Sequence, residues 1–134
     1  MTLIVGIKCH DGIVLGADGA ATLSVMGQTT VRQAIKKLDI IEKSIVVGVS
    51  GHVGLAQRIR GEIGTLWEAK KLAAIKPHEA MSIIREALWK HVEPELQAAR
   101  VAMNVIGPGA AAESAICATM VALPISKIPC LFHF

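Results

Sequence analysis

The chain has 134 residues, of which 52% are hydrophobic and 19% charged, with a mean hydropathy of +0.51. This aliphatic composition excludes a disordered tail, a collagen-like repeat and a solvated coiled coil. The formal net charge of +3 is too small to indicate a nucleic-acid-binding protein, because the basic residues do not cluster with aromatic ones. Residues such as Arg58, Arg60 and Lys70 instead alternate with acidic residues, as on a solvated helix face.

The sequence contains neither a membrane-spanning pattern nor a secretory one. No window reaches the roughly 18 consecutive apolar residues that a transmembrane helix needs, and Met1–Ile7 is apolar without a preceding positive charge. The five histidines and three cysteines have no metal-ligand spacing, so Cys9, Cys117 and Cys130 are expected to be reduced and buried. We therefore expect a cytoplasmic protein that binds no membrane, nucleic acid or metal.

Strands are predicted for the N-terminal part of the chain. Two apolar runs, residues 2–9 and Ile13–Ala17, flank Asp11-Gly12, and this arrangement is the strongest short-range signal for a β-hairpin. Neither run alternates apolar with polar residues, so both faces of the hairpin are expected to be covered. The small and polar residues 18–30 are predicted to form a loop. A second antiparallel pair is predicted at Lys37–Ile41 and Ser44–Val49.

Two helices are predicted next, because the apolar spacing changes from two to three or four residues at His52. The first helix is expected to end near Lys71. The second begins near Pro77, a residue favoured in a first helical turn, and Pro94 is expected to bend or split it. The order of strands, helices and strands predicts the α+β class. The remaining segments are a turn or flexible loop at 107–112, a strand at Ala115–Leu123 and a final stretch at Cys130–Phe134.

The second residue could act as a nucleophile. A side chain as small as that of Thr2 generally allows removal of Met1, which leaves a hydroxyl and a free α-amine on one residue. A hydroxyl is a weak nucleophile unless a base takes its proton, and an amine with a pKa of about 7.7–8.0 is a suitable base. With Met1 attached, the amine is part of a peptide bond, so that form is expected to be inactive.

Further motifs appear from Thr2 onward in a distinctive order. They are Thr2–Gly6, Asp11–Asp18, Lys36-Lys37-Leu38 before a strand, and Val49-Ser50-Gly51 directly before a helix. With these motifs the chain resembles the N-terminal half of proteasome β-type subunits, including bacterial relatives that form self-contained or ATPase-driven peptidase rings. The motifs extend from Thr2 to about Arg60, and the remainder agrees with the family in the order of its elements.

The resemblance implies an N-terminal nucleophile hydrolase fold, a four-layer αββα sandwich of stacked antiparallel sheets between layers of helices. Each sheet would then meet the other sheet on one face and helices on the other, which accounts for strands that are apolar on both faces. Residues 1–134 would form a single proteasome-type domain, truncated on its C-terminal side, so that the second half of the sandwich is missing or incomplete. Apolar surface that the remaining strands would cover is expected to be bare.

The resemblance also assigns catalytic roles. Thr2 would be the nucleophile and its own amine the base, while the positive charge of Lys37 would favour the deprotonated hydroxyl. Asp18 would pair with Lys37 and hold it, and the backbone N–H of Gly51 would stabilise the oxyanion. Lys37 is preferred to Lys36 for its spacing to Gly51. The structural alternatives are a turn residue for Asp18, a solvated strand end for Lys37 and a strand-to-helix turn for Gly51.

Four small or aliphatic residues are assigned to the pocket for the substrate residue before the cleaved bond: Ala21, Ile35, Val49 and Val53. They favour an apolar substrate residue. Core packing explains Val49 and Val53 equally well.

The activity that the resemblance implies is that of a threonine-type endopeptidase that needs no cofactor. It would hydrolyse peptides or unfolded polypeptides through an acyl-enzyme ester inside a homo-oligomeric ring, and the need for an ATPase partner stays open. The alternative is a non-catalytic structural ring subunit or an inactive truncated homologue. The family places a supporting Ser and Asp in its C-terminal half, beyond Phe134, which motivates this alternative. Retention of Thr2, Asp18, Lys37 and Gly51 together favours the enzyme.

Overall fold

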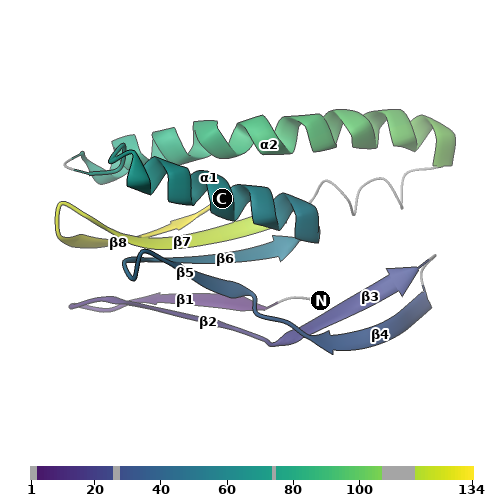
Figure 1. Cartoon of the computed structure of the whole chain (residues 1–134), viewed down its shortest axis with the longest axis horizontal. Helices are drawn as coiled ribbons and strands as arrows, with labels where there is room; N and C mark the ends of the chain where they lie inside the picture. Colours follow the sequence, from purple (N-terminus) through teal and green to yellow (C-terminus); the bar gives the residue numbers. More distant parts are fainter. Residues whose placement is uncertain (1–2, 26–27, 74, 107–116) are drawn as a thin grey trace.

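The structure, a computed structural model, describes residues 3–25, 28–73, 75–106 and 117–134, with the backbone alone for residues 21–25 and 28–33. Two helices lie over one face of a four-stranded antiparallel sheet, and two β-hairpins lie on the other side of that sheet (Figure 1). The elements are β1 (Ile4–Lys8), β2 (Ile13–Ala17), β3 (Ala20–Val25), β4 (Gln28–Ala34), β5 (Leu38–Ile41), β6 (Ile45–Gly51), α1 (Val53–Glu68), α2 (Pro77–Ile106), β7 (Cys117–Ile125) and β8 (Ile128–His133).

The four-stranded sheet has the order β5-β6-β7-β8, with each neighbouring pair antiparallel. The predicted pairing of β5 with β6 is confirmed, with Ile41 opposite Ile45. Between β7 and β8, Ser126 and Lys127 both have positive φ, at 48° and 66°. Positive φ at both central residues is what a type I′ hairpin turn requires, and such turns match the right-handed twist of the strands.

The main core lies between this sheet and the helices. Alternate residues of β6 and β7 point toward α1 and α2, and the helices present an apolar stripe in return. This core excludes water from the side of the sheet that faces the helices. Its fully buried members include Ile45, Val47, Leu55, Ile59, Ile63, Ile84 and Val121.

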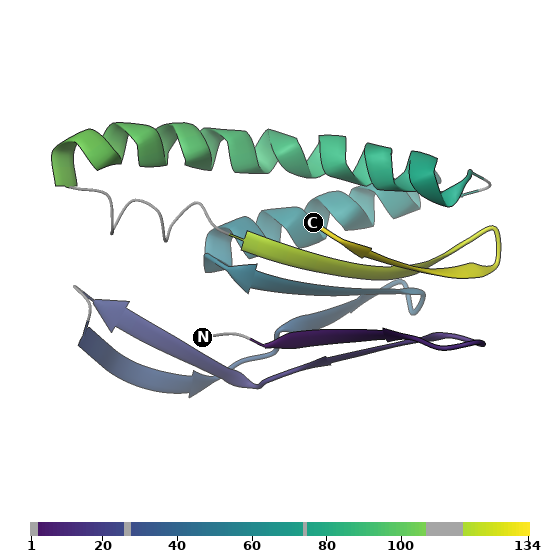
Figure 2. The same ribbon diagram turned by 180° about the vertical axis from the view of Figure 1, so that it is seen from behind.

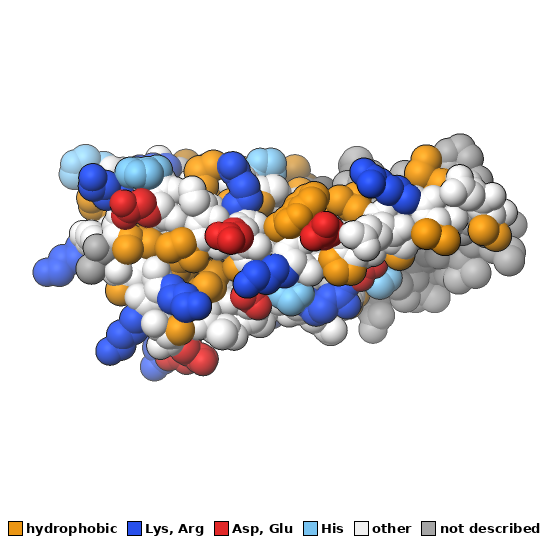
Figure 3. Space-filling view, turned by 90° about the horizontal axis from the view of Figure 1, so that it is seen from above, with side chains coloured by type: hydrophobic (Ala, Val, Ile, Leu, Met, Phe, Trp, Pro, Cys, Tyr) orange, Lys and Arg blue, Asp and Glu red, His pale blue; other side chains and the backbone are white. Residues whose placement is uncertain are grey.

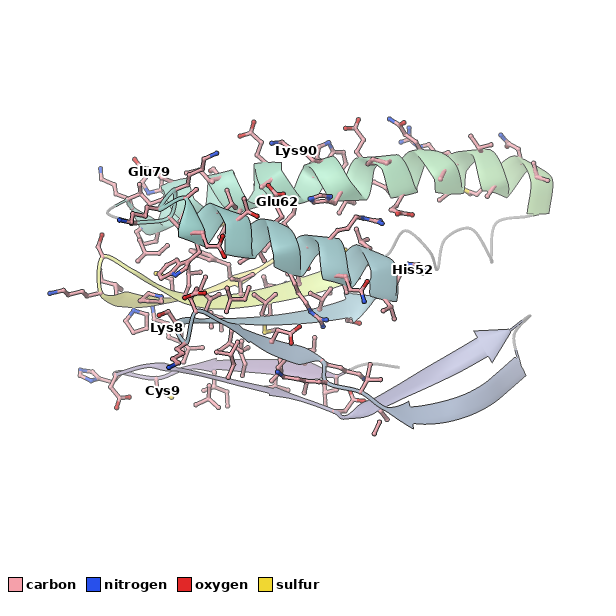
Figure 4. All side chains as sticks on the ribbon, in the orientation of Figure 1. Lys8, Cys9, His52, Glu62, Glu79 and Lys90 are labelled. Atoms are coloured by element: carbon pink, nitrogen blue, oxygen red, sulfur yellow. The ribbon has the colours of Figure 1, made fainter. Side chains whose placement is uncertain are left out.

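The two helices are also joined by polar pairs at their edges. His91 Nε2 of α2 lies 3.2 Å from Glu62 Oε2 of α1, and Arg58 of α1 pairs with Glu95 of α2. Glu62 lies on the side of α1 that approaches α2 (Figure 4). These partly exposed pairs align the helices, but the stability of the layer comes mainly from its buried face.

The prediction that Pro94 bends or splits the second helix is wrong with respect to a split. α2 is one helix of 30 residues with Pro94 inside it, and its C-terminal part extends past the start of α1 (Figure 2). A proline leaves the carbonyl four residues earlier, that of Lys90, without its helical N–H partner. Both Lys90 and Pro94 are exposed, so this carbonyl lies on the side of the helix where water can satisfy it.

The predicted N-terminal hairpin is confirmed, with β1 and β2 paired from Ile4 opposite Ala17 to Lys8 opposite Ile13. Its inner face packs on the four-stranded sheet, closely enough that a Cβ on Gly6 would lie 2.8 Å from Met120 Sδ. Its outer face is exposed, which corrects the expectation that both faces are covered. No second helical layer lies on that face within the described residues. The exposed apolar side chains on it are Val5, Ile7 and Val14.

The predicted loop at residues 18–30 is wrong, because β3 and β4 form an antiparallel hairpin there with a register shift between Leu23 and Ser24. Small and polar residues suggested turn chemistry, but Thr22, Val25 and Val31 are β-branched and suit strands. The predicted loop at 107–112 lies outside the described residues.

The cysteines differ from one another in their environments. All three are free thiols: Cys130 is buried and Cys117 is half-buried, where burial raises the pKa of its thiol. Cys9 is exposed near the tip of the first hairpin (Figure 4), so the expectation that every cysteine is buried is wrong for this residue.

Candidate active site

An ion pair joins the end of β2 to the start of β5. Lys37 Nζ donates a hydrogen bond to Asp18 Oδ2 at 2.7 Å, with 3% of the Lys37 side chain exposed and 33% of the Asp18 side chain. Lys36, in contrast, is 74% exposed and lies 3.6 Å from Asp39. The structure therefore brings Lys37, and not Lys36, to Asp18.

Asp18 also fixes the N-terminal strand. The Leu3 N–H donates to Asp18 Oδ1 at 2.7 Å, the Asp18 N–H donates to the Leu3 carbonyl at 3.1 Å, and the Ala20 N–H donates to Asp18 Oδ2 at 3.3 Å. The hydrogen bond from Lys37, followed by that from Leu3, lowers the pKa of Asp18 from 3.8 to about 2. Asp18 is therefore ionised at neutral pH, and its carboxylate holds the Lys37 ammonium beside the start of β1. Thr2 itself lies outside the described residues.

Two cavities adjoin this arrangement. A cavity of about 410 Å³ is bordered by Asp18, Lys37 and Ile35. A smaller cavity of about 180 Å³ is bordered by Leu3 and Ser50. Leu3 borders the smaller cavity and Asp18 the larger one, and the two residues are hydrogen-bonded to each other.

Gly51 ends β6, directly before α1. Its φ of 128° is in the region that favours glycine, because a Cβ is strained there. Gly51 is exposed and lies opposite Cys117 in the strand pairing, while its neighbour Ser50 borders the smaller cavity together with Leu3. The end of β6 and the residue before β1 therefore border the same cavity. His52 follows Gly51 and is the N-cap of α1 (Figure 4).

The predicted substrate-pocket residues fall in different places. Ile35 borders the larger cavity beside Lys37, and Val53 is 58% exposed at the start of α1. Val49 is buried in the core between the sheet and the helices, so the structure does not bring it to Lys37, and core packing explains this residue. The exposure of Val53 does not fit core packing. The side chain of Ala21 lies outside what the structure describes.

The charge pattern of the sequence places Arg60 on a solvated face, whereas the structure places it against Asp39 and Lys37. Its side chain is 23% exposed, its Nε lies 2.8 Å from Asp39 Oδ2, and its Nη2 donates to the Lys37 carbonyl at 3.4 Å. Helical spacing carried a signal, since Arg60 is four residues after Ala56 and three before Ile63, both of which are buried. A cation on the buried stripe of a helix indicates a specific partner.

Other classes of site find no support in the described ranges. They contain no group of three or more His, Cys, Asp or Glu residues that could hold a metal ion, and neither of their helices is long and apolar enough to cross a membrane. On the face covered by the helices, basic and acidic side chains are interspersed (Figure 3). That face lacks the single-sign basic surface that binds nucleic acid.

Comparison with known proteins gives one consistent answer. The family model described as "Proteasome subunit" matches residues 2–73 of this chain. The proteasome subunit beta of Methanococcus aeolicus is 34% identical over 90 residues, which cover 65% of this chain and 40% of that protein. The chain thus matches about two-fifths of the length of this curated relative. The observed antiparallel sheets and two helices agree with part of an N-terminal nucleophile hydrolase fold. The chain belongs to the proteasome subunit family, as a β-type member.

Proposed function

We propose that the protein is a threonine-type endopeptidase subunit in which Thr2 becomes the nucleophile once Met1 is removed. The observation that carries this proposal is the pairing of Lys37 with Asp18, whose other oxygen accepts the Leu3 N–H. That N–H belongs to the peptide bond that joins Leu3 to Thr2. Asp18 thereby links the buried Lys37 ammonium to Leu3, the residue that follows Thr2 in the sequence.

In the proposed reaction, the Thr2 hydroxyl attacks the scissile carbonyl carbon while the Thr2 amine takes the hydroxyl proton. The positive charge of Lys37 favours the deprotonated hydroxyl, and the Gly51 N–H stabilises the oxyanion that forms. Collapse of this intermediate breaks the peptide bond, and the leaving amine takes the proton from the Thr2 amine. Water then hydrolyses the ester, with the same amine as base, which releases the second product and restores Thr2.

The substrates that we propose are peptides or unfolded polypeptides with an apolar residue before the cleaved bond. The aliphatic side chain of Ile35 at the cavity beside Lys37 supports this preference, with Val53 as a second candidate. Membership of the proteasome family supports assembly into a multi-subunit ring, which we propose to be homo-oligomeric. A single domain over residues 1–134, a cytoplasmic location and the use of an ATPase partner stay predictions.

The test is hydrolysis of a fluorogenic peptide by the complete protein, after intact-mass measurement has established whether Met1 is removed. We expect Thr2→Ala to lose about a thousandfold or more in kcat, because the nucleophile is gone. A boronate should label Thr2 in the native protein. Thr65→Ala is the matched control, since Thr65 lies exposed on α1 and donates its hydroxyl proton to the Gly61 carbonyl. Its activity should equal that of the native protein.

Three results would contradict the proposal: Met1 retained in the assembled particle, hydrolysis unchanged by Thr2→Ala, or a boronate that fails to label Thr2 in that particle. Each would favour the alternative of a structural, non-catalytic ring subunit or an inactive homologue.

A further inference from the structure

Arg60 contacts the same short segment that carries Lys37. Lys37 immediately precedes β5, and its side chain reaches Asp18 on the hairpin layer. Arg60 approaches from α1, on the other side of the sheet, where its Nη2 donates to the Lys37 carbonyl and its Nε lies against Asp39. The segment from Lys37 to Asp39 is therefore held from both sides. Asp18 binds the side chain of Lys37, while Arg60 binds the Lys37 carbonyl and the Asp39 carboxylate.

The chemistry of the guanidinium suits this task. Its nitrogens are fixed in one plane, so a single side chain can meet a carboxylate and a carbonyl in a set geometry. The contact of Nε with Asp39 is an ion pair and not a hydrogen bond, since this buried atom has no hydrogen-bond partner in the described part of the chain. Arg60 is thus held mainly by charge at Asp39, while Nη2 reaches the Lys37 carbonyl. Because only 23% of the Arg60 side chain is exposed, water screens its contact with Asp39 less than it screens a surface ion pair.

Arg58 offers an internal comparison on the same helix. It is 46% exposed and pairs with Glu95 of α2, so it faces the other helix and not the sheet. Two arginines in one turn of α1 therefore have different partners. Only the half-buried one contacts the segment that presents the ammonium.

We propose that Arg60 is a positioning residue: by holding the Lys37 carbonyl and Asp39, it keeps the Lys37 ammonium on Asp18. The consequence for catalysis rests on the proposed function, but the placement of Lys37 does not. Among the residues whose side chains the structure describes, Lys37 is the charged group that contacts Asp18, while Lys36 borders the same cavity with a largely exposed side chain. Loosening the Lys37 segment therefore removes the charge that most affects Asp18.

The first experiment follows the Asp18 carboxyl by NMR titration of the complete protein and needs no activity. In Arg60→Met, which keeps the length of the side chain but loses its charge, the pKa of Asp18 should rise from about 2 toward 3.8. In the control Arg58→Met, the pKa should stay at the native value. A thermal melt establishes that each variant is folded. If Arg60→Met does not fold, Arg60→Lys serves, since it keeps a charge for Asp39 but lacks the planar fork.

With Arg60→Lys we expect a smaller rise in the pKa of Asp18 than with Arg60→Met. An Asp18 pKa equal to the native one in a folded Arg60 variant would overturn the proposal. An equal rise in Arg58→Met would overturn it as well, because the effect would then be general to α1.

The second experiment asks whether this placement matters for turnover. We expect Arg60→Met to lower kcat about tenfold to a hundredfold with little change in KM, as for a displaced catalytic group. Arg60→Lys should restore part of the lost kcat, because it keeps a charge for Asp39. If the native protein shows no Thr2-dependent hydrolysis, the proposed function fails, whereas the Asp18 titration still decides the role of Arg60.

Discussion

The two sides of the four-stranded sheet differ in how completely they are covered. Toward the helices, side chains such as Ile45, Val47 and Val121 have no exposed surface. On the opposite side, the β1–β2 hairpin contacts the sheet with one face and leaves Ile7 and Val14 of its other face 56% and 60% exposed. Of the candidate catalytic residues, Asp18 lies on this second side, at the end of β2, and the Lys37 side chain reaches it there. The fully buried core and the Asp18–Lys37 pair therefore occupy different layers, which meet where the hairpin packs on the sheet.

Two contacts between the hairpin and the rest of the molecule illustrate how these layers meet. Gly6 allows the hairpin to approach the sheet at Met120 and Leu131, and Asp18 ties the hairpin to Lys37. We therefore expect substitutions on the helix side of the sheet to change the free energy of unfolding most. Substitutions at the junction should have intermediate effects, and those on the outer face should have very small ones.

The largest expected effect is in the helix-side core. Ile59→Ala should lower the free energy of unfolding by about 2–5 kcal/mol, because Ile59 is fully buried and the truncation leaves a cavity. Ile7→Ala makes the same chemical change on the outer face of the hairpin and should cost about 0.5 kcal/mol or less. Urea denaturation of this chain measures both. Equal costs would contradict the comparison and would mean that another surface covers Ile7.

The next effect is expected where the hairpin meets the sheet. Gly6→Ala should destabilise the chain by about 1–3 kcal/mol, because its Cβ would lie 2.8 Å from Met120 Sδ and 2.9 Å from Leu131 Cδ2. The control is Gly16→Ala on the outer face of the same hairpin, where an added Cβ meets nothing within 4 Å. It should leave the unfolding midpoint nearly unchanged. A midpoint that shifts equally for both variants would show that the strand backbone, and not contact with the sheet, sets the cost.

Short sequence patterns predicted the elements whose turn residues or apolar spacing are distinctive. Asp11-Gly12 between apolar runs predicted the first hairpin, and the apolar stripe through Ile59 and Ile63 predicted α1. The β3–β4 hairpin was missed because its strands are stabilised by pairing with each other, which composition does not reveal. Small and polar residues such as Ser24 and Thr29 suit a loop as well as a strand that is paired along its backbone.

The candidate site was predictable to the extent that it depends on residue types in order. The resemblance suggested that Asp18 and Lys37 meet, and they do so at 2.7 Å. The sequence assigns Val49 to the pocket with core packing as an equal explanation, and the structure turns Val49, like Val47, toward the helices. The charge pattern assigns Arg60 to solvent because it does not distinguish Arg60 from Arg58. Both cases concern the side of an element on which a residue lies, which depends on packing between layers and not on the local pattern.

A smaller effect at the same junction concerns Asp18, whose side chain is one-third exposed and so partly screened by water. Its pKa is lowered from 3.8 to about 2 in the folded chain, so the carboxylate stabilises the fold fully above pH 4. This contribution is lost as the pH falls from about 4 to about 2, because the folded state must then take up the proton that the unfolded state already holds. Asp18→Asn should remove this part of the pH dependence, whereas Asp11→Asn, in the exposed turn of the same hairpin, should retain it. Urea denaturation between pH 2 and pH 7 provides the measurement. An Asp18→Asn variant whose stability falls below pH 4 as steeply as that of the native chain would mean that the pair with Lys37 does not fasten the hairpin to the sheet.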